Sequence, residues 1–144
     1  MGEIPQASHS DPPPTPERSR LMSRVKGADT KPEWIVRRLL HKMGYRYRLH
    51  RKDLPGTPDI VFLARRKAIF VHGCFWHRHE GCRMTTTPKI RSAFWKEKFE
   101  ANKERDRRKF RELDAMGWGY LVVWECETRN KEDLKHRLWN FLDQ

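Results

Sequence analysis

The sequence predicts one α/β domain in which a mixed β-sheet is flanked by helices. Its length of 144 residues suits a single domain with a modest core. Apolar residues recur near the period of an α-helix in three segments, residues 30–43, 92–116 and 131–142. Short apolar or alternating runs typical of strands occupy residues 45–50, 59–63, 67–71 and 120–124. The resulting order, helix, three strands, long helix, strand and helix, indicates an α/β architecture.

The composition indicates a nucleic-acid partner. The chain carries 31 Lys and Arg against 19 Asp and Glu, a formal net charge of +12, and its pI is near 10.1. A surplus of this size favours a polyanion, because each neutralised phosphate releases condensed counterions. No apolar run approaches the length of a membrane span, and residues 1–20 contain no apolar core of a signal peptide. We therefore expect a cytoplasmic protein with no membrane partner.

The N-terminal segment differs in composition from the rest of the chain. Residues 1–17 are rich in Pro and Ser and nearly free of apolar side chains, so we predict a disordered tail. A single domain is expected over residues 18–144. Its first part, residues 18 to about 28, is basic with a few apolar side chains. This part either extends the tail or forms an arm that becomes ordered on DNA.

The first helix is predicted to begin at a capping box formed by Thr30 and Glu33 and to end at Gly44. Its apolar stripe is expected to consist of Trp34, Ile35, Leu39, Leu40 and Met43. Residues 45–50 then alternate like a strand with one wet, basic face. They belong to a segment, residues 37–52, that contains seven Lys or Arg and no acid.

Two apolar strands follow the turn sequence LPGTPD. The reversal between residues 59–63 and 67–71 is so short that we expect antiparallel neighbours. The long helix is predicted to end with Gly117 as its C-cap. The side chains expected to form the apolar stripe of this helix are Phe94, Trp95, Phe99, Phe110, Leu113 and Met116.

Cysteine and histidine gather in the loop after the strand at residues 67–71. Cys74, His79 and Cys82 form the pattern C-x4-H-x2-C, and structural zinc takes four tetrahedral nitrogen or sulfur ligands. Cys126 follows the last strand and completes a Cys3His set if that strand lies beside residues 67–71. The alternative is three unconnected thiols, which we expect to be reduced because an odd number of cysteines makes no disulfide framework. We favour zinc because the site uses every cysteine.

Acids and histidines beside this loop suggest catalysis. Asp59 opens a strand and suits a hard cation such as Mg²⁺, which takes oxygen ligands, or it is a turn residue. His72 and His77 can exchange protons near neutral pH, or they are structural histidines. Glu33 is either the reciprocal carboxylate of the capping box or a residue that helps to hold a metal-bound water.

Two neighbouring aromatic residues, Phe75 and Trp76, lie in the same polar loop. Both cannot easily face a core, and the alternative is a wedge inserted into a base stack, as some DNA-binding proteins use. Trp95, by its pattern alone, fits the core side of the long helix. The loop therefore combines residues suited to metal binding, to proton transfer and to base stacking.

With these residues in view, the chain resembles the very short patch repair (Vsr) DNA mismatch endonucleases from about residue 18 to residue 129. The motifs that carry the resemblance are RSRLM, LPGTPDIVF, IFVHGCFWH, FW at positions 94 and 95, NKERDRR and GWGYLVVWEC. The resemblance implies a restriction-endonuclease-like core that nicks double-stranded DNA 5′ to the thymine of a T:G mismatch, the product of 5-methylcytosine deamination. Repair synthesis over a very short patch follows.

The resemblance also implies roles for individual residues. Asp59 looks like the Mg²⁺ carboxylate and His77 like the acid/base that activates water, with His72 and Glu33 in support. At Val71 the family pattern can carry a threonine that binds metal through its backbone carbonyl, which valine retains. The implied zinc ligands are Cys74, His79, Cys82 and Cys126. The implied DNA-inserting residues are Phe75, Trp76 and Trp95, with Met22 of the arm entering from the minor groove.

We therefore predict a monomeric, Mg²⁺-dependent DNA endonuclease with a structural Zn²⁺ ion, associated with the nucleoid in the cytoplasm. Its expected partners are T:G-containing duplex DNA and repair proteins that act after the nick. Two alternatives remain: a sequence-specific restriction-type endonuclease on the same core, and a zinc-stapled DNA-binding module without catalysis. The module explains the charge, the cysteines and the aromatic residues equally well, but it leaves Asp59, His72 and His77 as coincidence.

Overall fold

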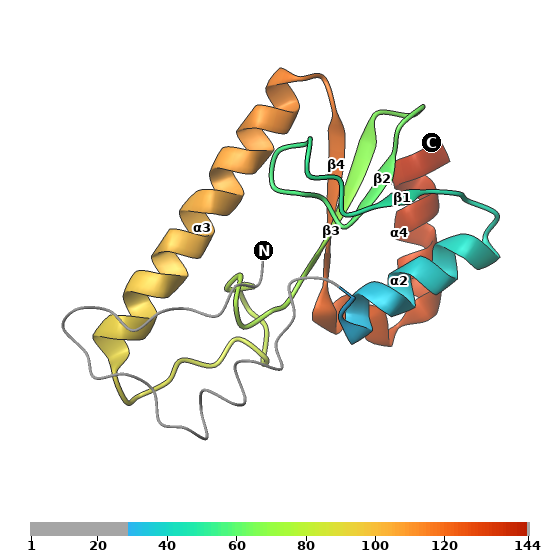
Figure 1. The fold of residues 1–144 in the computed structure, drawn as a ribbon. Helices are drawn as coiled ribbons and strands as arrows, with labels where there is room; N and C mark the ends of the chain where they lie inside the picture. The colour runs from blue at the N-terminus through green and yellow to red at the C-terminus, as the bar shows by residue number, and fades with distance from the viewer. Residues whose placement is uncertain (1–28, 144) are drawn as a thin grey trace.

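Four strands form a mixed sheet with helices on both faces, in the predicted order of elements (Figure 1). The computed structural model describes residues 29–143. The predicted tail at residues 1–17, the arm and its Met22 lie outside these residues. The elements are α2 (Lys31–Lys42), β1 (Arg48–Leu49), β2 (Ile60–Phe62), β3 (Lys67–His72), α3 (Ser92–Ala115), β4 (Gly119–Trp124), the 3₁₀ helix η1 (Glu125–Arg129) and α4 (Lys131–Asp143). None of the described helices is long and apolar enough to cross a membrane.

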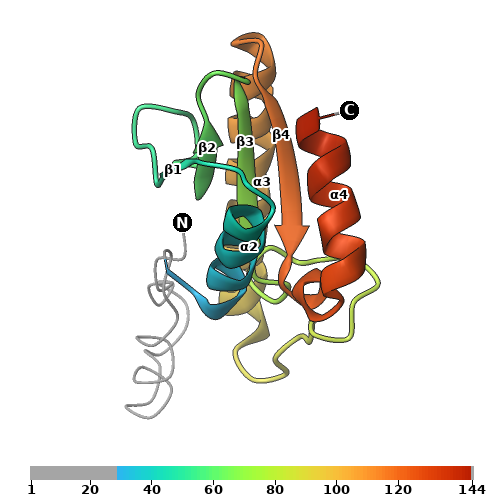
Figure 2. The same cartoon turned by 90° about the vertical axis from the view of Figure 1, so that its right-hand side faces the viewer.

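The strands are ordered β1-β2-β3-β4 across the sheet. β2 and β3 pair antiparallel, with Ile60 opposite Ile69, which confirms the hairpin prediction. β4 pairs parallel with β3 after the α3 crossover, from Lys67 opposite Gly119 to His72 opposite Trp124. Because these two strands are parallel and in register, their carboxyl ends meet at one edge of the sheet, where the loop that follows β3 begins (Figure 2).

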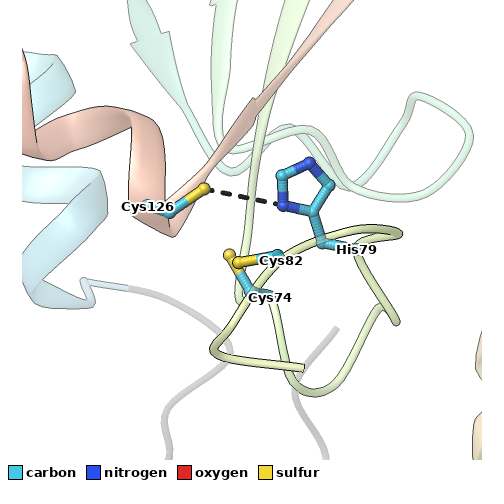
Figure 3. Close-up of side chains that lie close together, drawn as sticks. All are labelled: Cys74, His79, Cys82 and Cys126. Carbon is cyan, nitrogen blue, oxygen red and sulfur yellow. Dashed lines mark hydrogen bonds between the residues drawn. The ribbon is translucent and has the colours of Figure 1, made fainter. Parts of the chain in front are cut away.

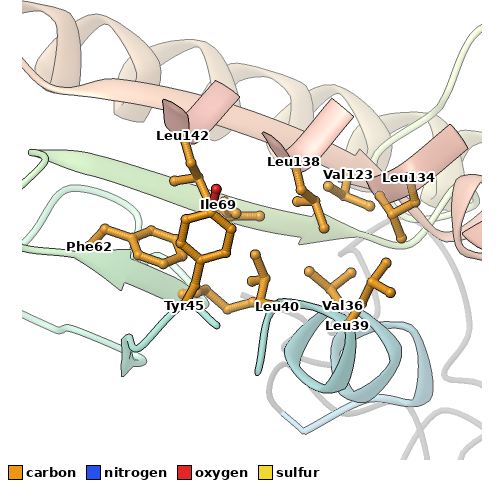
Figure 4. Close-up of a cluster of buried hydrophobic side chains, with 11 residues drawn as sticks. Val36, Leu39, Leu40, Tyr45, Phe62, Ile69, Val123, Leu134, Leu138 and Leu142 are labelled. Carbon is orange, nitrogen blue, oxygen red and sulfur yellow. The ribbon is translucent and has the colours of Figure 1, made fainter. Parts of the chain in front are cut away.

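The alternation of side chains along the strands builds two cores on opposite faces of the sheet. Ile60, Phe62 and Ile69 face α2 and α4, and the buried cluster on that face appears in Figure 4. The intervening residues Val61 and Ala68 belong to a second cluster, which includes Leu113 of α3. The sheet is thus the central layer between α3 on one side and the α2–α4 pair on the other (Figure 1).

Residues 45–50 pair over a shorter stretch than predicted, since β1 contains two residues. Tyr45 is buried and its hydroxyl donates a hydrogen bond to Asp143 of α4. The Tyr47 hydroxyl donates to the carbonyl of Arg37 at 3.1 Å. These two hydroxyls therefore anchor the segment to α4 and α2, while both rings pack edge-on against Phe62 of β2. His50, with a φ of 48°, ends the strand.

α2 confirms its predicted cap but not the whole of its predicted stripe. The Thr30 hydroxyl accepts a hydrogen bond from the Glu33 amide at 3.3 Å. Trp34, expected on the apolar face, is 42% exposed, and the Arg37 guanidinium lies 3.9 Å from its ring centroid. Val36 takes the fully buried position instead. The helix therefore presents a slightly different face to the sheet from the one predicted.

α3 buries Phe94, Trp95, Phe99 and Leu113 as predicted, whereas Met116 is 43% exposed. Met116 is itself the C-cap, and Gly117, with a φ of 76°, follows it rather than forming the cap. The buried face of α3 also contains two charged side chains that the apolar pattern did not predict, Asp106 and Lys109.

Candidate active site and metal centre

The three cysteines and His79 meet at the shared carboxyl edge of β3 and β4. The ligand atoms of all four residues lie within 4.8 Å of one another. Figure 3 shows the four side chains gathered together, three from the loop and Cys126 from the segment after β4. Cys126 Sγ lies 3.5 Å from His79 Nδ1. The parallel pairing of β3 and β4 delivers Cys126 to the loop, which is the arrangement on which the zinc prediction depended. These residues are the four predicted from the sequence.

Contacts within the loop orient the four candidate ligands. The His79 amide donates to the Cys74 carbonyl at 3.0 Å, and the Thr85 hydroxyl donates to the His79 carbonyl at 2.7 Å. The His79 ring stacks on Trp124 at 4.2 Å between centroids. The imidazole is therefore held with Nδ1 toward Cys126, and backbone hydrogen bonds fix the turn that carries it.

The chemistry of the donor set fits a soft divalent cation. Burial raises the pKa of Cys74 to about 12, so a thiolate at this position requires a nearby positive charge. Cys82, by contrast, has its pKa lowered to about 7, first by the Met84 amide. Three thiols and one imidazole nitrogen are the ligands that structural zinc takes, and zinc binding removes the thiol protons.

Asp59 lies at the start of β2, and its carboxylate turns toward β3. Its Oδ2 accepts a hydrogen bond from the Val71 amide at 2.8 Å, which places the carboxylate beside the residue that precedes His72. Burial, together with the negative charge of Glu33, raises the pKa of Asp59 to about 7, although the Val71 amide opposes this shift. A partly buried carboxylate with an acid nearby is a favourable environment for a cation with oxygen ligands.

Glu33 is almost fully buried, with 1% of its surface exposed, and it has structural partners as well as a place near Asp59. Its Oε1 accepts from the Asp29 amide at 3.1 Å, one residue before the position expected for a capping box. Its Oε2 lies 2.8 Å from His50 Nε2 and 3.2 Å from Arg37 Nη1. Glu33 therefore accepts from the residue before the N-cap and not from Thr30 as a capping box requires, whereas its position near Asp59 is compatible with holding a metal-bound water.

His50 was not singled out from the sequence. It belongs to the basic alternating segment, where a histidine does not stand out from its neighbours. Its backbone amide donates to the Asp59 carbonyl at 3.1 Å, and its ring contacts Glu33. The left-handed backbone at this residue brings a side chain from β1 to the site, and no sequence signal indicates such a conformation.

His72 and His77 stack face to face, with ring centroids 3.7 Å apart and an interplanar angle of 8°. His77 Nδ1 lies 2.7 Å from Asp106 Oδ2. Because a carboxylate only accepts hydrogen bonds, His77 carries a proton on Nδ1 and presents Nε2 as the basic nitrogen. Burial, reinforced by His77 and Lys109, lowers the pKa of His72 well below its usual value, so the His72 ring is neutral.

Asp106 and Lys109 are, like His50, site residues that were not singled out from the sequence. Lys109 Nζ lies 2.9 Å from Asp106 Oδ1 and 3.1 Å from His72 Nε2. Both residues come from a run in which charged side chains alternate at nearly every position, so nothing in the pattern separates buried charges from solvated ones. Their spacing of three residues, which places them on one face of α3, is the only hint that the sequence contains.

The three aromatic residues predicted to contact DNA form one cluster beside the loop. Phe75 and Trp76 are partly exposed, whereas Trp95 is 2% exposed. The Trp95 ring centroid lies 5.9 Å from that of Phe75 and 5.8 Å from that of Trp76. Asn102 fixes the loop against α3 by donating to the Trp76 carbonyl at 3.2 Å. Trp95 thus packs in the core of this cluster.

Comparison with known proteins gives matches over most of the chain. Residues 11–83 match the family described as "DNA mismatch endonuclease Vsr". The "Type II nicking enzyme V.XorIIP" of Xanthomonas oryzae pv. oryzae is 57% identical over 130 residues, which cover 90% of this chain and 95% of that protein. The "Type II nicking enzyme V.NmeAIP" of Neisseria meningitidis serogroup A is 42% identical over 124 residues, covering 86% and 88%. The "DNA mismatch endonuclease Vsr" of Escherichia coli K12 is 43% identical over 117 residues, covering 81% and 74%.

Proposed function

This chain belongs to the DNA mismatch endonuclease Vsr family and is a DNA endonuclease, and from that premise we propose that it nicks duplex DNA 5′ to the thymine of a T:G mismatch. The nick would start very short patch repair. The observation that carries this proposal is the grouping of Asp59, His72 and His77 beside a loop that carries adjacent aromatic side chains. One site thereby combines groups for phosphodiester hydrolysis with groups that can stack on bases.

We assign the catalytic cation to Asp59 and to the backbone carbonyl of Val71, with Mg²⁺ as the ion. Mg²⁺ bound there would polarise the attacking water and stabilise the charge that develops on the scissile phosphate. The carboxylate of Asp59 and a carbonyl oxygen are hard ligands of the kind that Mg²⁺ prefers. Glu33, close enough to raise the pKa of Asp59, adds negative charge that favours a cation.

His77 is the residue we assign to proton transfer. Its Nδ1 is engaged by Asp106 at 2.7 Å, so its Nε2 can accept the proton that the attacking water loses as the bond to phosphorus forms. Asp106 holds the ring in that orientation and stabilises the imidazolium that results. His72 supports this arrangement through the stacked contact between the two rings.

In this proposal the zinc ion fixes the conformation of the loop. Cys74, His79 and Cys82 would bind it from the loop and Cys126 from the segment after β4, so no ligand position remains for a reacting water. The ion would thereby connect the aromatic loop to the sheet. Its contribution to nicking is structural.

Mismatch recognition is assigned to Phe75, Trp76 and Trp95, with Met22 of the arm on the minor-groove side. A T:G pair should be easier to unstack than a matched pair, so an inserted wedge can test deformability. Because Trp95 packs against Phe99 and Phe75, its insertion requires the cluster to open when DNA binds. Positive charge in residues 37–52 and on α3 would contribute affinity without sequence information.

A second candidate is a restriction-type endonuclease that nicks a matched recognition sequence. The names of the Xanthomonas and Neisseria relatives, which call them type II nicking enzymes, favour this alternative. The non-catalytic module is set aside, because the chain belongs to a family of endonucleases. The two remaining candidates differ in whether nicking requires the mispair.

A nicking assay with paired substrates tests the proposal. The protein with Mg²⁺ is incubated with a T:G duplex and with the T:A and C:G duplexes of the same flanking sequence. We expect nicking of the T:G duplex alone, and its loss in Asp59→Ala. Asp53→Ala, an exposed acid in the same loop, serves as the matched control and should retain activity.

Two outcomes would contradict the assignment. Nicking of the matched duplexes at the T:G rate would support the restriction-type candidate. Undiminished nicking by Asp59→Ala would remove Asp59 from the metal site. Binding of the T:G duplex by both variants, measured without divalent ions, separates loss of catalysis from loss of affinity.

A further inference from the structure

Lys109 is a buried cation inside the site that the proposed mechanism does not use. Its side chain is 4% exposed, and its ammonium contacts Asp106 Oδ1 at 2.9 Å and His72 Nε2 at 3.1 Å. The ammonium also lies 4.2 Å from the ring centroid of Phe70. An unpaired buried ammonium would be costly, and these contacts compensate it.

The turn before β2 is built to accommodate this lysine. A Cβ atom added at Gly56 would lie 2.4 Å from Lys109 Cδ and 3.0 Å from its Cβ, closer than side-chain atoms pack. Gly56 also has a φ of 75°, which favours glycine. The same turn leads directly to Asp59. The methylene groups of Lys109 therefore pack against the turn at Gly56 that precedes Asp59.

The contact with Lys109 determines which nitrogen of His72 carries the proton. An ammonium group only donates hydrogen bonds, so His72 Nε2 must accept and the proton must lie on Nδ1. His72 Nδ1 makes no hydrogen bond within the described part of the chain. The lone pair of His72 Nε2 is thus engaged by the Lys109 ammonium.

His77 has the opposite arrangement. Its Nδ1–H donates to Asp106, and Lys109 holds the second oxygen of that carboxylate. The two stacked rings therefore present different nitrogens. His72, His77 and Asp106 are close enough together to bind a metal ion, but the Lys109 ammonium already supplies the positive charge at this cluster.

We propose that Lys109 is a positioning residue that fixes the stacked histidines in different tautomers, with His72 Nε2 accepting from the ammonium and His77 Nε2 left as the proton acceptor. Its ammonium acts on His72 directly and on His77 through Asp106. The proposal deepens the proposed function, on which it rests for the identity of the reaction. The tautomers themselves require neither DNA nor metal.

Nitrogen NMR of histidine provides the direct test. Protein labelled with ¹⁵N in histidine is studied without DNA or Mg²⁺, and the His72 signals are identified from their loss in His72→Gln. We expect the Nδ1–H tautomer for His72 in the wild type. Lys109→Met, which keeps the stem and removes the donor, should change that tautomer. Lys109→Gln, which restores a neutral donor, should retain it.

Single-turnover nicking and DNA affinity supply the functional readout. We expect Lys109→Met to lower the nicking rate of the T:G duplex about 100-fold, the scale of a lost general acid–base group. Affinity measured without divalent ions should change by less than about 3-fold, because a buried side chain supplies no phosphate contact. Lys135→Met, which removes a half-exposed lysine of α4, should leave both quantities unchanged.

Gly56→Ala provides a second variant that leaves Lys109 in the sequence. The new methyl group should displace the lysine stem and alter the His72 tautomer. Gly117→Ala is its matched control, because Gly117 has a φ of 76° and no atom within 4 Å of the added Cβ. Gly117→Ala introduces backbone strain but does not displace Lys109, so the His72 tautomer should be unchanged.

An unchanged His72 tautomer in folded Lys109→Met would overturn the proposal, as would the Nε2–H tautomer in the wild type. Failure of the proposed function has a different signature. Equal nicking of matched and mismatched duplexes would leave the tautomer result intact and would change only the reaction that Lys109 serves.

Discussion

At the scale of single residues, the carboxylate of Asp106 connects the two halves of the site. One oxygen contacts His77 Nδ1 and the other contacts Lys109 Nζ. The role assigned to Asp106 is to orient His77 and to stabilise the imidazolium that forms when Nε2 accepts a proton. An amide at this position keeps the shape but removes the charge and can favour the other tautomer.

Asp106→Asn should therefore lower the single-turnover nicking rate by about 100-fold or more, on the scale seen when a carboxylate that orients a catalytic histidine is lost. The measurement is quenched-time-course nicking of the T:G duplex. Asp114→Asn, an exposed acid on the same helix, is the matched control. A rate within about 3-fold of the wild type would contradict the orienting role.

Asp106→Asn should also change how the free energy of unfolding depends on pH under acidic conditions. Burial alone would raise the pKa of Asp106, but His77 and Lys109 outweigh it and lower the pKa below its ordinary value of 3.8. Asp106 therefore stabilises the fold above that value, and the contribution is lost as pH falls through the native pKa. Urea unfolding between about pH 5 and pH 3 should show a shallower loss of unfolding free energy in Asp106→Asn than in the wild type.

Residue chemistry explains which site residues the sequence could reveal. The cysteines and histidines stand out because they are few, closely spaced and attached to an apolar strand. Asp106 and Lys109 cannot be recognised in the same way, since they lie in a run of exposed charges of both signs. Only the packing of α3 against the sheet distinguishes these two from neighbours such as Arg107, which is exposed.

At the scale of elements, the register of β3 and β4 brings the loop and Cys126 together. If these residues bind zinc, the ion links two segments that are separated by the whole of α3. Loss of one ligand should then weaken the attachment of the loop and not only the affinity for metal.

Cys126→Ser should reduce bound zinc from about one ion per chain to a small fraction and lower the midpoint of thermal unfolding. Elemental analysis after dialysis against a weak chelator measures the first quantity, and calorimetry measures the second. Glu80→Gln, an exposed acid of the same loop, should retain its zinc. Full zinc occupancy in Cys126→Ser would remove this residue from the ligand set.

The pairing of β2 with β3 could be predicted, whereas the pairing of β1 and the packing of the helices could not. A reversal of a few residues between β2 and β3 leaves little choice but an antiparallel pair. The short β1 depends instead on Tyr45, whose hydroxyl contacts Asp143 at the far end of the chain. Likewise, Trp34 lies on the exposed side of α2, where the Arg37 guanidinium covers part of its ring, a contact that helical periodicity does not report.

At the scale of the whole molecule, a formal charge of +12 is spread over a protein whose proposed substrate is itself a dense polyanion. Contacts to phosphates carry no information about the mispair. Discrimination must therefore come from the aromatic cluster and the catalytic groups, whereas the charge determines how strongly any duplex is bound.

If charge supplies affinity for any duplex, the binding of mismatched and matched duplexes should depend on salt to the same extent. The logarithm of the association constant, plotted against the logarithm of salt concentration, should fall steeply for T:G and T:A duplexes, with slopes that agree within about one unit. Fluorescence anisotropy without divalent ions, between about 50 and 200 mM salt, measures both slopes. A slope near zero, or a slope much steeper for T:G than for T:A, would contradict an electrostatic contribution shared by all duplexes.

The three-layer arrangement could be predicted from the distribution of apolar residues, because each helix has one apolar face and each inner strand is apolar on both faces. The joint position of the candidate zinc ligands, Asp59 and the stacked histidines follows from the sheet order, in which β4 lies beside β3. From the sequence this neighbour relation was only a condition of the zinc prediction. The buried pair on α3, Asp106 and Lys109, could be recognised only from the structure.

Nicking 5′ to the thymine of a T:G pair can be tested by mapping the cut at nucleotide resolution. A T:G duplex labelled at one end of each strand is incubated with the protein and Mg²⁺ under single-turnover conditions. We expect one product, from the thymine-containing strand, cut at the phosphodiester bond 5′ to that thymine. A cut in the guanine-containing strand, or an equal cut in the matched T:A duplex, would contradict it.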